Sequence, residues 1–335
     1  MSKRSASPAV LAARAAVDAS LDDLPAGACV LVACSGGPDS LALAGAAAWV
    51  APRRGLTVHA VIVDHGLQVG SSVAAAEAAR QCCALGLADA EVVAVDVGTE
   101  GGPEAAARAA RYDALAVAAE RLSAPVVLLG HTRDDQAETV LLRLARGSGA
   151  RALSAMRARN DPWRRPFLGM ARADVHAVAT ELLGPLGETA WRDPHNTDVA
   201  YARVRVRDLL AGLSAALGPG AVLGLSRSAD LLRDDADALD AMAEVEYART
   251  VSAAGLDIAA ECDALQRLPR AVRTRVIRLM GLRSGCPPDE LGFEHVAQIE
   301  SLVVDWHGQG ELRLPGRVVA GRSYDRLWFR SRDEE

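Results

Sequence analysis

The sequence predicts an α/β protein: a doubly wound parallel sheet, followed by a smaller, mostly helical domain with a few short strands near its end. In the first half, Val-rich apolar runs alternate with Ala-rich stretches of helical length. Apolar strands of this kind are typical of parallel sheets covered on both faces, and the alternation predicts βαβ units. The expected strands are Cys29–Cys34, Val58–Val63, Glu91–Val97 and Pro125–Gly130, and the expected helices are Leu41–Val50, Ser71–Leu87 and Pro103–Leu122.

A chain of 335 residues is expected to form about two domains. Gly218-Pro219-Gly220 interrupts the chain before a long helical stretch, Leu223–Thr250, and short strand-like pieces flank Pro315-Gly316 near the end. We therefore expect four segments. They are an N-terminal tail and helix over 1–27, the α/β domain over 28–217, a linker helix over 218–250 and a C-terminal domain over 251–335.

The hexapeptide Ser35-Gly36-Gly37-Pro38-Asp39-Ser40 lies between the first predicted strand and the first predicted helix. Two glycines allow backbone conformations that a Cβ atom forbids, and a helix N-terminus favours an anion, most often phosphate. The two serine hydroxyls and the carboxylate of Asp39 suit a phosphate together with a divalent cation. The chain's one lysine, Lys3, lies far from this turn, which excludes a Walker loop.

Polar residues also follow the second and fourth predicted strands. Asp64 and His65 follow the second strand, and an acidic helix start follows the fourth. Because ligands of doubly wound sheets bind at the carboxyl ends of the strands, we expect these groups and Ser35–Ser40 to line one pocket. Helix capping and acids in a first helical turn are the alternative explanation for the residues after the fourth strand. Those residues are His131, Asp134, Asp135 and Glu138.

Arginines on two predicted helices are further candidates. Arg108 and Arg111, three residues apart, either reach toward phosphate or substrate or belong to a solvated helix face. Arg203, Arg205 and Arg207 cannot share one helical face, so they suit contacts with several anionic groups, or form an ordinary basic helix.

Charge and cysteine content narrow the class of protein. The net charge is −6, yet Arg143–Arg172 carries eight arginines and one acid, which predicts a local RNA-binding face. None of the six cysteines forms a C-x-x-C pair, which disfavours a zinc ribbon or a redox dithiol. With no apolar run of about 18 residues and no convincing signal peptide, we expect a cytoplasmic protein without membrane contact.

These motifs occur together, and in this order, in a known family. Ser35–Ser40 resembles the SGGxDS loop of the PP-loop (N-type) ATP pyrophosphatases. Residues 28–215 are similar to the tRNA(Ile)-lysidine synthetase family, in a shorter form without the last C-terminal domain. His195 and Val204 depart from that family's usual pattern. The motifs that carry the resemblance are Ser35–Ser40, Val63–Leu67, Ala107–Tyr112, Gly130–Thr139, Arg146–Gly149 and Asp193–Arg207, with a looser likeness at Leu265–Leu282 and Leu314-Pro315-Gly316.

The resemblance implies a ligase that forms a carbon–nitrogen bond in two steps. ATP adenylates the C2 oxygen of the wobble cytidine in a CAU anticodon of tRNA(Ile) and releases pyrophosphate. The amine of free L-lysine then attacks C2, AMP leaves, and lysidine results. It also implies that the C-terminal domain binds tRNA, and it leaves the oligomeric state open, a homodimer included.

The resemblance further implies roles for the candidate residues, with ATP and Mg²⁺ as cofactors. Ser35, Gly36, Gly37 and Ser40 would hold the pyrophosphate in a cofactor-binding loop that includes Pro38. Asp64 and His65 would contact the nucleotide, although His65 taken alone could also be a structural histidine. Asp39 would bind Mg²⁺ or orient the attack. His131 and Asp134 would position the adenylated centre, and Arg108 and Arg111 would steady it. Asp135 and Glu138 would attract the lysine ammonium group, and Arg205 its carboxylate.

Two other classes are weighed against this function. A PP-loop tRNA thiolase would use paired cysteines for sulfur transfer, and the chain has no such pair. A non-enzymatic nucleotide sensor would tolerate loss of Asp39, Asp134 and Glu138, yet all three are present.

Overall fold

The computed structural model describes residues 5–331 except 67, 69, 99–101, 148, 192–201 and 255–256. The chain forms two compact units, Met1–Asp230 and Leu231–Glu335. Along the chain, the boundary between them lies within α9 (Ala221–Thr250), the helix predicted as a linker. Within the described residues no single helix passes the length and hydropathy test for a membrane span. The consecutive pair α8 (Ala202–Leu217) and α9 passes it only when taken together, across a bend of 107°.

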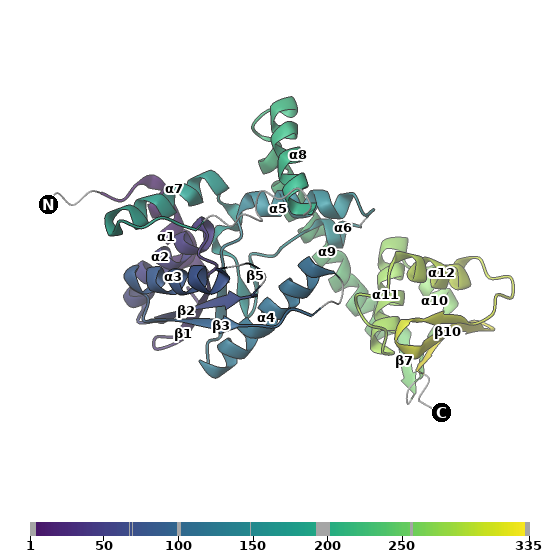
Figure 1. Ribbon diagram of the computed structural model, residues 1–335. Coiled ribbons are helices and arrows are strands. Elements are labelled where there is room, and N and C mark those ends of the chain that lie inside the picture. Colours follow the sequence, from purple (N-terminus) through teal and green to yellow (C-terminus); the bar gives the residue numbers. More distant parts are fainter. Residues whose placement is uncertain are drawn as a thin grey trace. The chain divides into compact units, whose positions relative to one another are not determined.

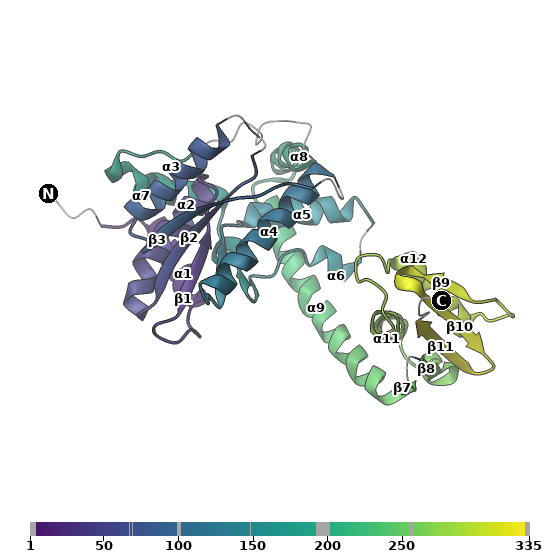
Figure 2. The ribbon, with the colours of Figure 1, turned by 60° about the horizontal axis from the view of Figure 1, so that its bottom comes forward.

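The first unit contains a six-stranded sheet in the order β3-β2-β1-β4-β6-β5 (Figures 1 and 2). Pairing is parallel from β3 to β6, and only the edge strand β5 is antiparallel to its neighbour. The predicted doubly wound parallel sheet is therefore confirmed. The strands are β1 (Cys29–Ala33), β2 (Thr57–Asp64), β3 (Asp89–Ala94), β4 (Val126–Leu129), β5 (Arg159–Asn160) and β6 (Trp163–Arg164).

Helices cover both faces of this sheet because side chains of successive strand residues point to opposite faces. Val30 and Val32 of β1 face a large core that α1, α2, α3 and α7 complete. Leu31 and Ala33 face a second core, formed with α4. The helices are α1 (Pro8–Ser20), α2 (Pro38–Val50), α3 (Ser71–Ala84), α4 (Pro103–Arg121), α5 (Arg133–Leu144), α6 (Ala150–Leu153) and α7 (Arg172–Leu183).

The segment Arg151–Arg172 has little hydrophobic periodicity, which favours a partly ordered basic loop, but part of it forms regular structure. This segment contains the end of α6, the β5–β6 hairpin and a 3₁₀ turn at Pro166–Gly169. The hairpin extends the sheet because β6 pairs with β4 at Val127↔Trp163 and Leu128↔Arg164. Two-residue strands are too short to produce a hydrophobic period, so the sequence carries no signal for them.

The second unit packs three helices against an antiparallel sheet in the order β7-β8-β11-β10-β9. It contains more β-structure than predicted, since β7 and β8 carry no clear alternation of polar and apolar residues. The sequence of Leu265–Leu282 favours one helix, but the structure forms two helices there, which separate at Pro269, the N-cap of the second. The elements are β7 (Val251–Ala254), β8 (Asp257–Glu261), α10 (Cys262–Gln266), α11 (Arg270–Arg283), α12 (Phe293–Val304), β9 (Leu312–Leu314), β10 (Val318–Ser323) and β11 (Arg326–Ser331).

Candidate active site

The turn between β1 and α2 has the geometry of an anion-binding loop. Gly36 has φ +78°, a left-handed conformation that favours glycine, and Gly37 is the N-cap of α2 without a side chain to satisfy the helix N–H groups. The Ser40 hydroxyl accepts from the Ser35 N–H (3.1 Å) and donates to the Gly37 carbonyl (3.0 Å), which fixes the loop. A phosphate is the natural acceptor for the N–H groups left over at such a helix start.

Gly130, at the end of β4, packs directly on this loop. A Cβ atom there would lie 3.0 Å from the Asp39 carbonyl oxygen and 3.2 Å from the Ser40 nitrogen. A Cβ atom at these distances would be tighter than most real contacts, and the neighbouring backbone would have to shift to admit it, so this position favours glycine. The close approach brings His131, the next residue, next to the phosphate loop.

Two histidines at strand ends are held neutral by burial. Burial, together with the nearby charges of Arg111, Arg165 and Arg108, lowers the pKa of His131 to about 3, although Asp135 opposes this. Burial and the Arg111 charge also lower the pKa of His65. The Nδ1 atoms of both rings are buried and have no hydrogen-bond partner among the described residues. An unsatisfied buried nitrogen is costly, which indicates that a ligand or water supplies the missing partner.

Three guanidinium groups form what we call the cation group: Arg108 and Arg111 of α4 and Arg165, which precedes the 3₁₀ turn. Arg111 makes no hydrogen bond or ion pair within the described chain, and burial lowers its pKa. The groups that act on it most strongly are Tyr112, Arg108, Cys34 and Arg203, none of them a carboxylate. A partly buried cation without a counter-ion is stabilised by an anionic ligand.

Tyr112 links the other two members of the cation group. Arg108 stacks over its ring at 4.8 Å and donates to its hydroxyl at 3.1 Å, and Arg165 approaches the same hydroxyl at 3.4 Å. The ring packs edge-on against Trp163, with centroids 4.7 Å apart. These neutral aromatic partners orient the guanidinium groups without cancelling their charge.

The carboxylate cluster consists of Asp134, Asp135 and Glu138 in the first turns of α5. Thr132 is the N-cap of α5, and Asp135 closes a capping box by accepting from the Thr132 N–H and hydroxyl, both at 2.7 Å. Asp134 accepts from the Arg172 N–H at 2.8 Å and so caps the start of α7. Helix capping therefore explains in part why acidic residues occur at the start of α5, as the alternative explanation predicts.

Arginines from α7 and α8 pair with the remaining carboxylate oxygens. Arg172 Nη2 donates to Asp135 Oδ1 (2.8 Å) and to Glu138 Oε1 (2.9 Å), and Arg207 Nε donates to the same Glu138 oxygen (3.1 Å). Burial raises the pKa of Asp135, but the Arg172 charge and the Thr132 hydrogen bonds outweigh it and hold that pKa below its usual range. These two carboxylates, predicted to attract an ammonium group, are thus already paired with cations in part.

The other predicted site residues lie in different settings. Asp64 accepts from the Gly66 N–H (3.0 Å) and so closes the turn after β2. Arg205 is exposed on α8, whereas Arg203 on the same helix pairs with Glu104 of α4 at 3.0 Å. Asp193–Asp198, with His195, lie outside the described residues, and Val204 is buried.

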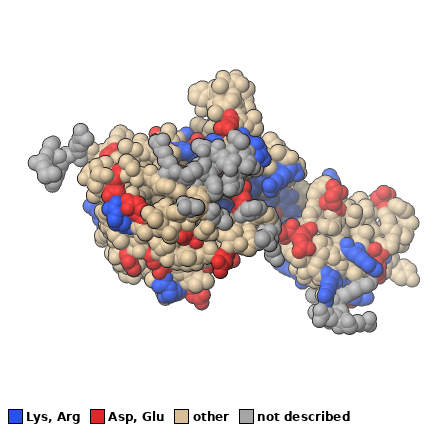
Figure 3. Space-filling model, viewed as in Figure 1, with Lys and Arg blue, Asp and Glu red and all other residues tan. Residues whose placement is uncertain are grey.

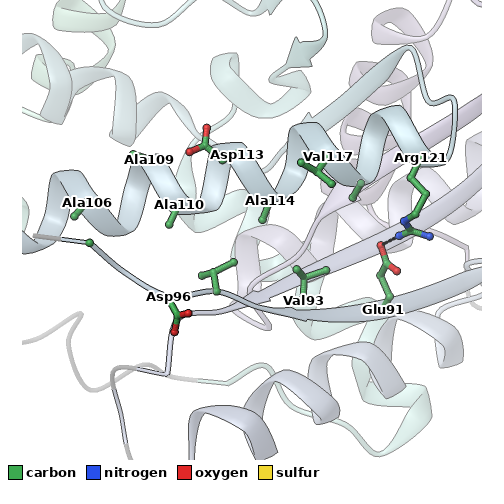
Figure 4. A pocket seen from close by; sticks show the side chains of 13 residues that line it. Glu91, Val93, Asp96, Ala106, Ala109, Ala110, Asp113, Ala114, Val117 and Arg121 are labelled. Atoms are coloured by element: carbon green, nitrogen blue, oxygen red, sulfur yellow. Dashed lines mark hydrogen bonds and ion pairs between the residues drawn. The ribbon is translucent and has the colours of Figure 1, made fainter. Parts of the chain in front are cut away.

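A cavity of about 990 Å³ lies elsewhere in the first unit, between β3 and α4 (Figure 4). Val93, Ala110 and Val117 line it, and the Glu91–Arg121 ion pair closes one end. None of the predicted site residues lines it. The candidate site is therefore a set of strand ends and helix starts, distinct from this groove.

Comparison with known proteins identifies the family. The family described as PP-loop domain matches residues 12–213, and the one described as TilS substrate binding domain matches residues 261–328. The chain is 54% identical to tRNA(Ile)-lysidine synthase of Thermobifida fusca, over 95% of this chain and 96% of that protein. It is 50% identical to the Streptomyces coelicolor protein of the same name, over 92% and 86% of the two chains. The chain belongs to the tRNA(Ile)-lysidine synthase family.

The fold comparison agrees with this assignment. The solved structure of U34-tRNA thiolase NcsA from Methanococcus maripaludis matches with a TM-score of 0.56 and 19% identity, over 68% of this chain and 80% of that one. At this identity the likeness shows the PP-loop type of fold alone.

Arg165 and Arg172 belong to the candidate site of this lysidine synthase family member, although no motif in the sequence singles them out. Both were counted in the basic run Arg143–Arg172 and assigned to an RNA-binding face. Within that run Arg143 donates to backbone carbonyls, Arg164 pairs with Asp23 and Asp161, and Arg172 pairs with the carboxylate cluster. Charge counting alone could not separate these internal arginines from those on the surface. In Figure 3, blue side chains of the first unit gather beside α6, whereas the rest of its visible face mixes both signs.

Proposed function

We propose that this chain ligates lysine to C2 of the wobble cytidine of tRNA(Ile) with a CAU anticodon, using ATP and releasing AMP and pyrophosphate. The observation that carries this proposal is the pairing of two opposite environments at one set of strand ends. A cation group that has no carboxylate partner among the described residues, with Arg165 buried and Arg111 partly buried, adjoins a cluster of three carboxylates. A two-step reaction with an anionic intermediate and an amine nucleophile needs both.

The adenylation step uses the phosphate loop and the cation group. The leftover N–H groups at the start of α2 and the hydroxyl of Ser35 would bind the pyrophosphate as it leaves. Arg111 and Arg108 would stabilise the negative charge that develops on the α-phosphate when the cytidine oxygen attacks. His131, neutral at physiological pH, would donate or accept one hydrogen bond at the adenylated centre without changing its charge.

The ligation step uses the carboxylate cluster. Asp135 and Glu138 would hold the amine of lysine as its ammonium form arrives, and would place it beside the adenylated carbon. Loss of one proton from the ammonium group to a carboxylate of the cluster would free the nitrogen lone pair. As the nitrogen then bonds to C2, the bond between C2 and the adenylated oxygen would break, and AMP would leave with that oxygen. Arg205, exposed on α8, would meet the lysine carboxylate.

Asp39 fits a site for Mg²⁺. Its Oδ1 atom is buried and accepts no hydrogen bond in the part of the chain that the structure describes, with His176 Nε2 3.3 Å away outside hydrogen-bond geometry. Mg²⁺ is typically held by one or two carboxylates together with substrate phosphates. Bound there, it would neutralise part of the triphosphate charge.

One experiment distinguishes the proposed ligase from the second candidate function, a nucleotide sensor without catalysis. Wild-type protein should exchange pyrophosphate into ATP only when tRNA(Ile) with a CAU anticodon is present, and should incorporate labelled lysine into that tRNA. D39A should lose nearly all exchange while its tRNA affinity stays within about twofold. D113A, which removes an exposed carboxylate of α4, serves as the matched control. Nucleotide binding without tRNA-dependent exchange or lysine incorporation would remove the proposed function.

A further inference from the structure

Arg172 lies at the centre of the carboxylate cluster, although no sequence motif singled it out. Its Nη2 atom donates to Asp135 at 2.8 Å and to Glu138 at 2.9 Å, and its backbone N–H donates to Asp134 at 2.8 Å. One residue in the first turn of α7 therefore contacts all three carboxylates that α5 presents.

These contacts are far from bulk solvent. The side chains of Arg172, Asp135 and Glu138 are 17%, 19% and 3% exposed. Exposed ion pairs contribute about 0–1 kcal/mol, whereas removing one partner of a buried pair leaves an uncompensated charge and costs considerably more. Burial lowers the pKa of Arg172, but the charges of Asp135 and Glu138 outweigh it and raise that pKa above its usual range. The charge of Arg172 likewise holds the pKa of Asp135 below its usual range.

Arg172 does not neutralise the cluster. Among the described residues, the guanidinium groups of Arg172 and Arg207 pair with Asp135 and Glu138, whereas Asp134 accepts only from the Arg172 backbone N–H, so the three carboxylates have two paired cations. Both arginines contact Oε1 of Glu138, so its Oε2 atom has no hydrogen bond to any described residue. A single ammonium group is the ligand that matches both the leftover charge and the leftover acceptor.

We propose that Arg172 is a positioning residue for the amine substrate. It fixes Asp135 and Glu138 in one arrangement, while Oε2 of Glu138 remains open to the ammonium group of lysine. This inference rests on the function proposed above and adds to it a residue that acts through the carboxylate cluster. Because Arg172 acts through the carboxylates, it affects capture of lysine and not adenylation.

The test compares R172A and R172K with R164A. Arg164 is also a buried arginine with two carboxylate partners, Asp23 and Asp161, but belongs to a separate ion-pair network. R172A should raise the KM for lysine roughly tenfold to a hundredfold, the size expected for losing charged hydrogen bonds. Its tRNA-dependent ATP–pyrophosphate exchange, measured without lysine, should stay within about twofold of wild type. R164A should lower the thermal unfolding midpoint without changing the KM for lysine.

R172K keeps the charge but loses the fork that reaches two carboxylates at once, so its KM for lysine should lie between those of wild type and R172A. The R172K variant also tests the positioning role of Arg172 if R172A does not fold. An unchanged KM in a folded Arg172 variant overturns the inference, and so does a parallel fall of exchange and ligation, which indicates a structural role only. Wild-type protein that forms no lysidine overturns the proposed function itself, whereas normal wild-type activity with unaffected Arg172 variants overturns this inference alone.

Discussion

The cation group and the carboxylate cluster lie at the same strand ends but differ in whether their charges have ion-pair partners within the protein. Arg111 has no ion-pair partner among the described residues, and Arg108 and Arg165 have only the Tyr112 hydroxyl, an aromatic ring and a backbone carbonyl. The carboxylates, in contrast, are held by a capping box and by two arginines. The first region is therefore ready for a strongly charged anion, and the second for a single cation.

This difference predicts that the two regions serve different half-reactions. The cation group should matter for adenylation, in which charge builds up on phosphate, and the carboxylate cluster for capture of the amine. Variants of one region should then leave the half-reaction of the other intact.

The largest effect is expected for R111A. Removing a preorganised cation that faces developing charge costs roughly a hundredfold to a thousandfold in rate. We expect tRNA-dependent ATP–pyrophosphate exchange to fall by that factor, while tRNA affinity changes little. R121A, on the same helix but paired with Glu91 away from the site, is the control and should retain its exchange activity. An R111A protein with normal exchange would show that the Arg111 guanidinium does not face the nucleotide.

A smaller effect is expected for E138Q. The amide keeps the shape of the carboxylate but loses the charge that matches an ammonium group. The KM for lysine should rise roughly tenfold to a hundredfold, as expected for one charged hydrogen bond. Steady-state lysine incorporation measures it, with E120Q on the exposed face of α4 as control. A KM equal to that of wild type would place the amine elsewhere.

The smallest effect concerns stability and pH through His131. Its pKa is about 3 in the folded protein and about 6.5 when unfolded, so the unfolded chain binds the extra proton as pH falls below 6.5. Between pH 7 and 4.5 the wild type should therefore lose about 2 kcal/mol more unfolding free energy than H131Q. Urea denaturation at the two pH values measures this, with H307Q in the second unit as control. Parallel losses in wild type and H131Q would mean that His131 is not held neutral.

Much of this arrangement could be predicted from local sequence. Apolar runs predict where the strands end. The motifs Ser35–Ser40 and Gly130–Thr139 can be recognised because their residues are consecutive in the sequence. Thr132 and Asp134 are both residue types that cap helices, and the structure selects Thr132.

The remaining features could not be predicted because they depend on partners distant in the chain. Arg172 meets Glu138 across 34 residues, and Arg165 meets Tyr112 across 53. Composition places both arginines in one basic run, although one belongs to the carboxylate cluster and the other to the cation group. Their different roles follow only from the fold, which brings α4, α5 and α7 to the same strand ends.

The most direct test of the division between the two regions measures tRNA-dependent ATP–pyrophosphate exchange, without lysine, in wild type, E138Q and R111A. The account predicts that E138Q exchanges at the wild-type rate while R111A loses at least a hundredfold. Equal losses of exchange in E138Q and R111A would contradict it, because both regions would then serve the same step.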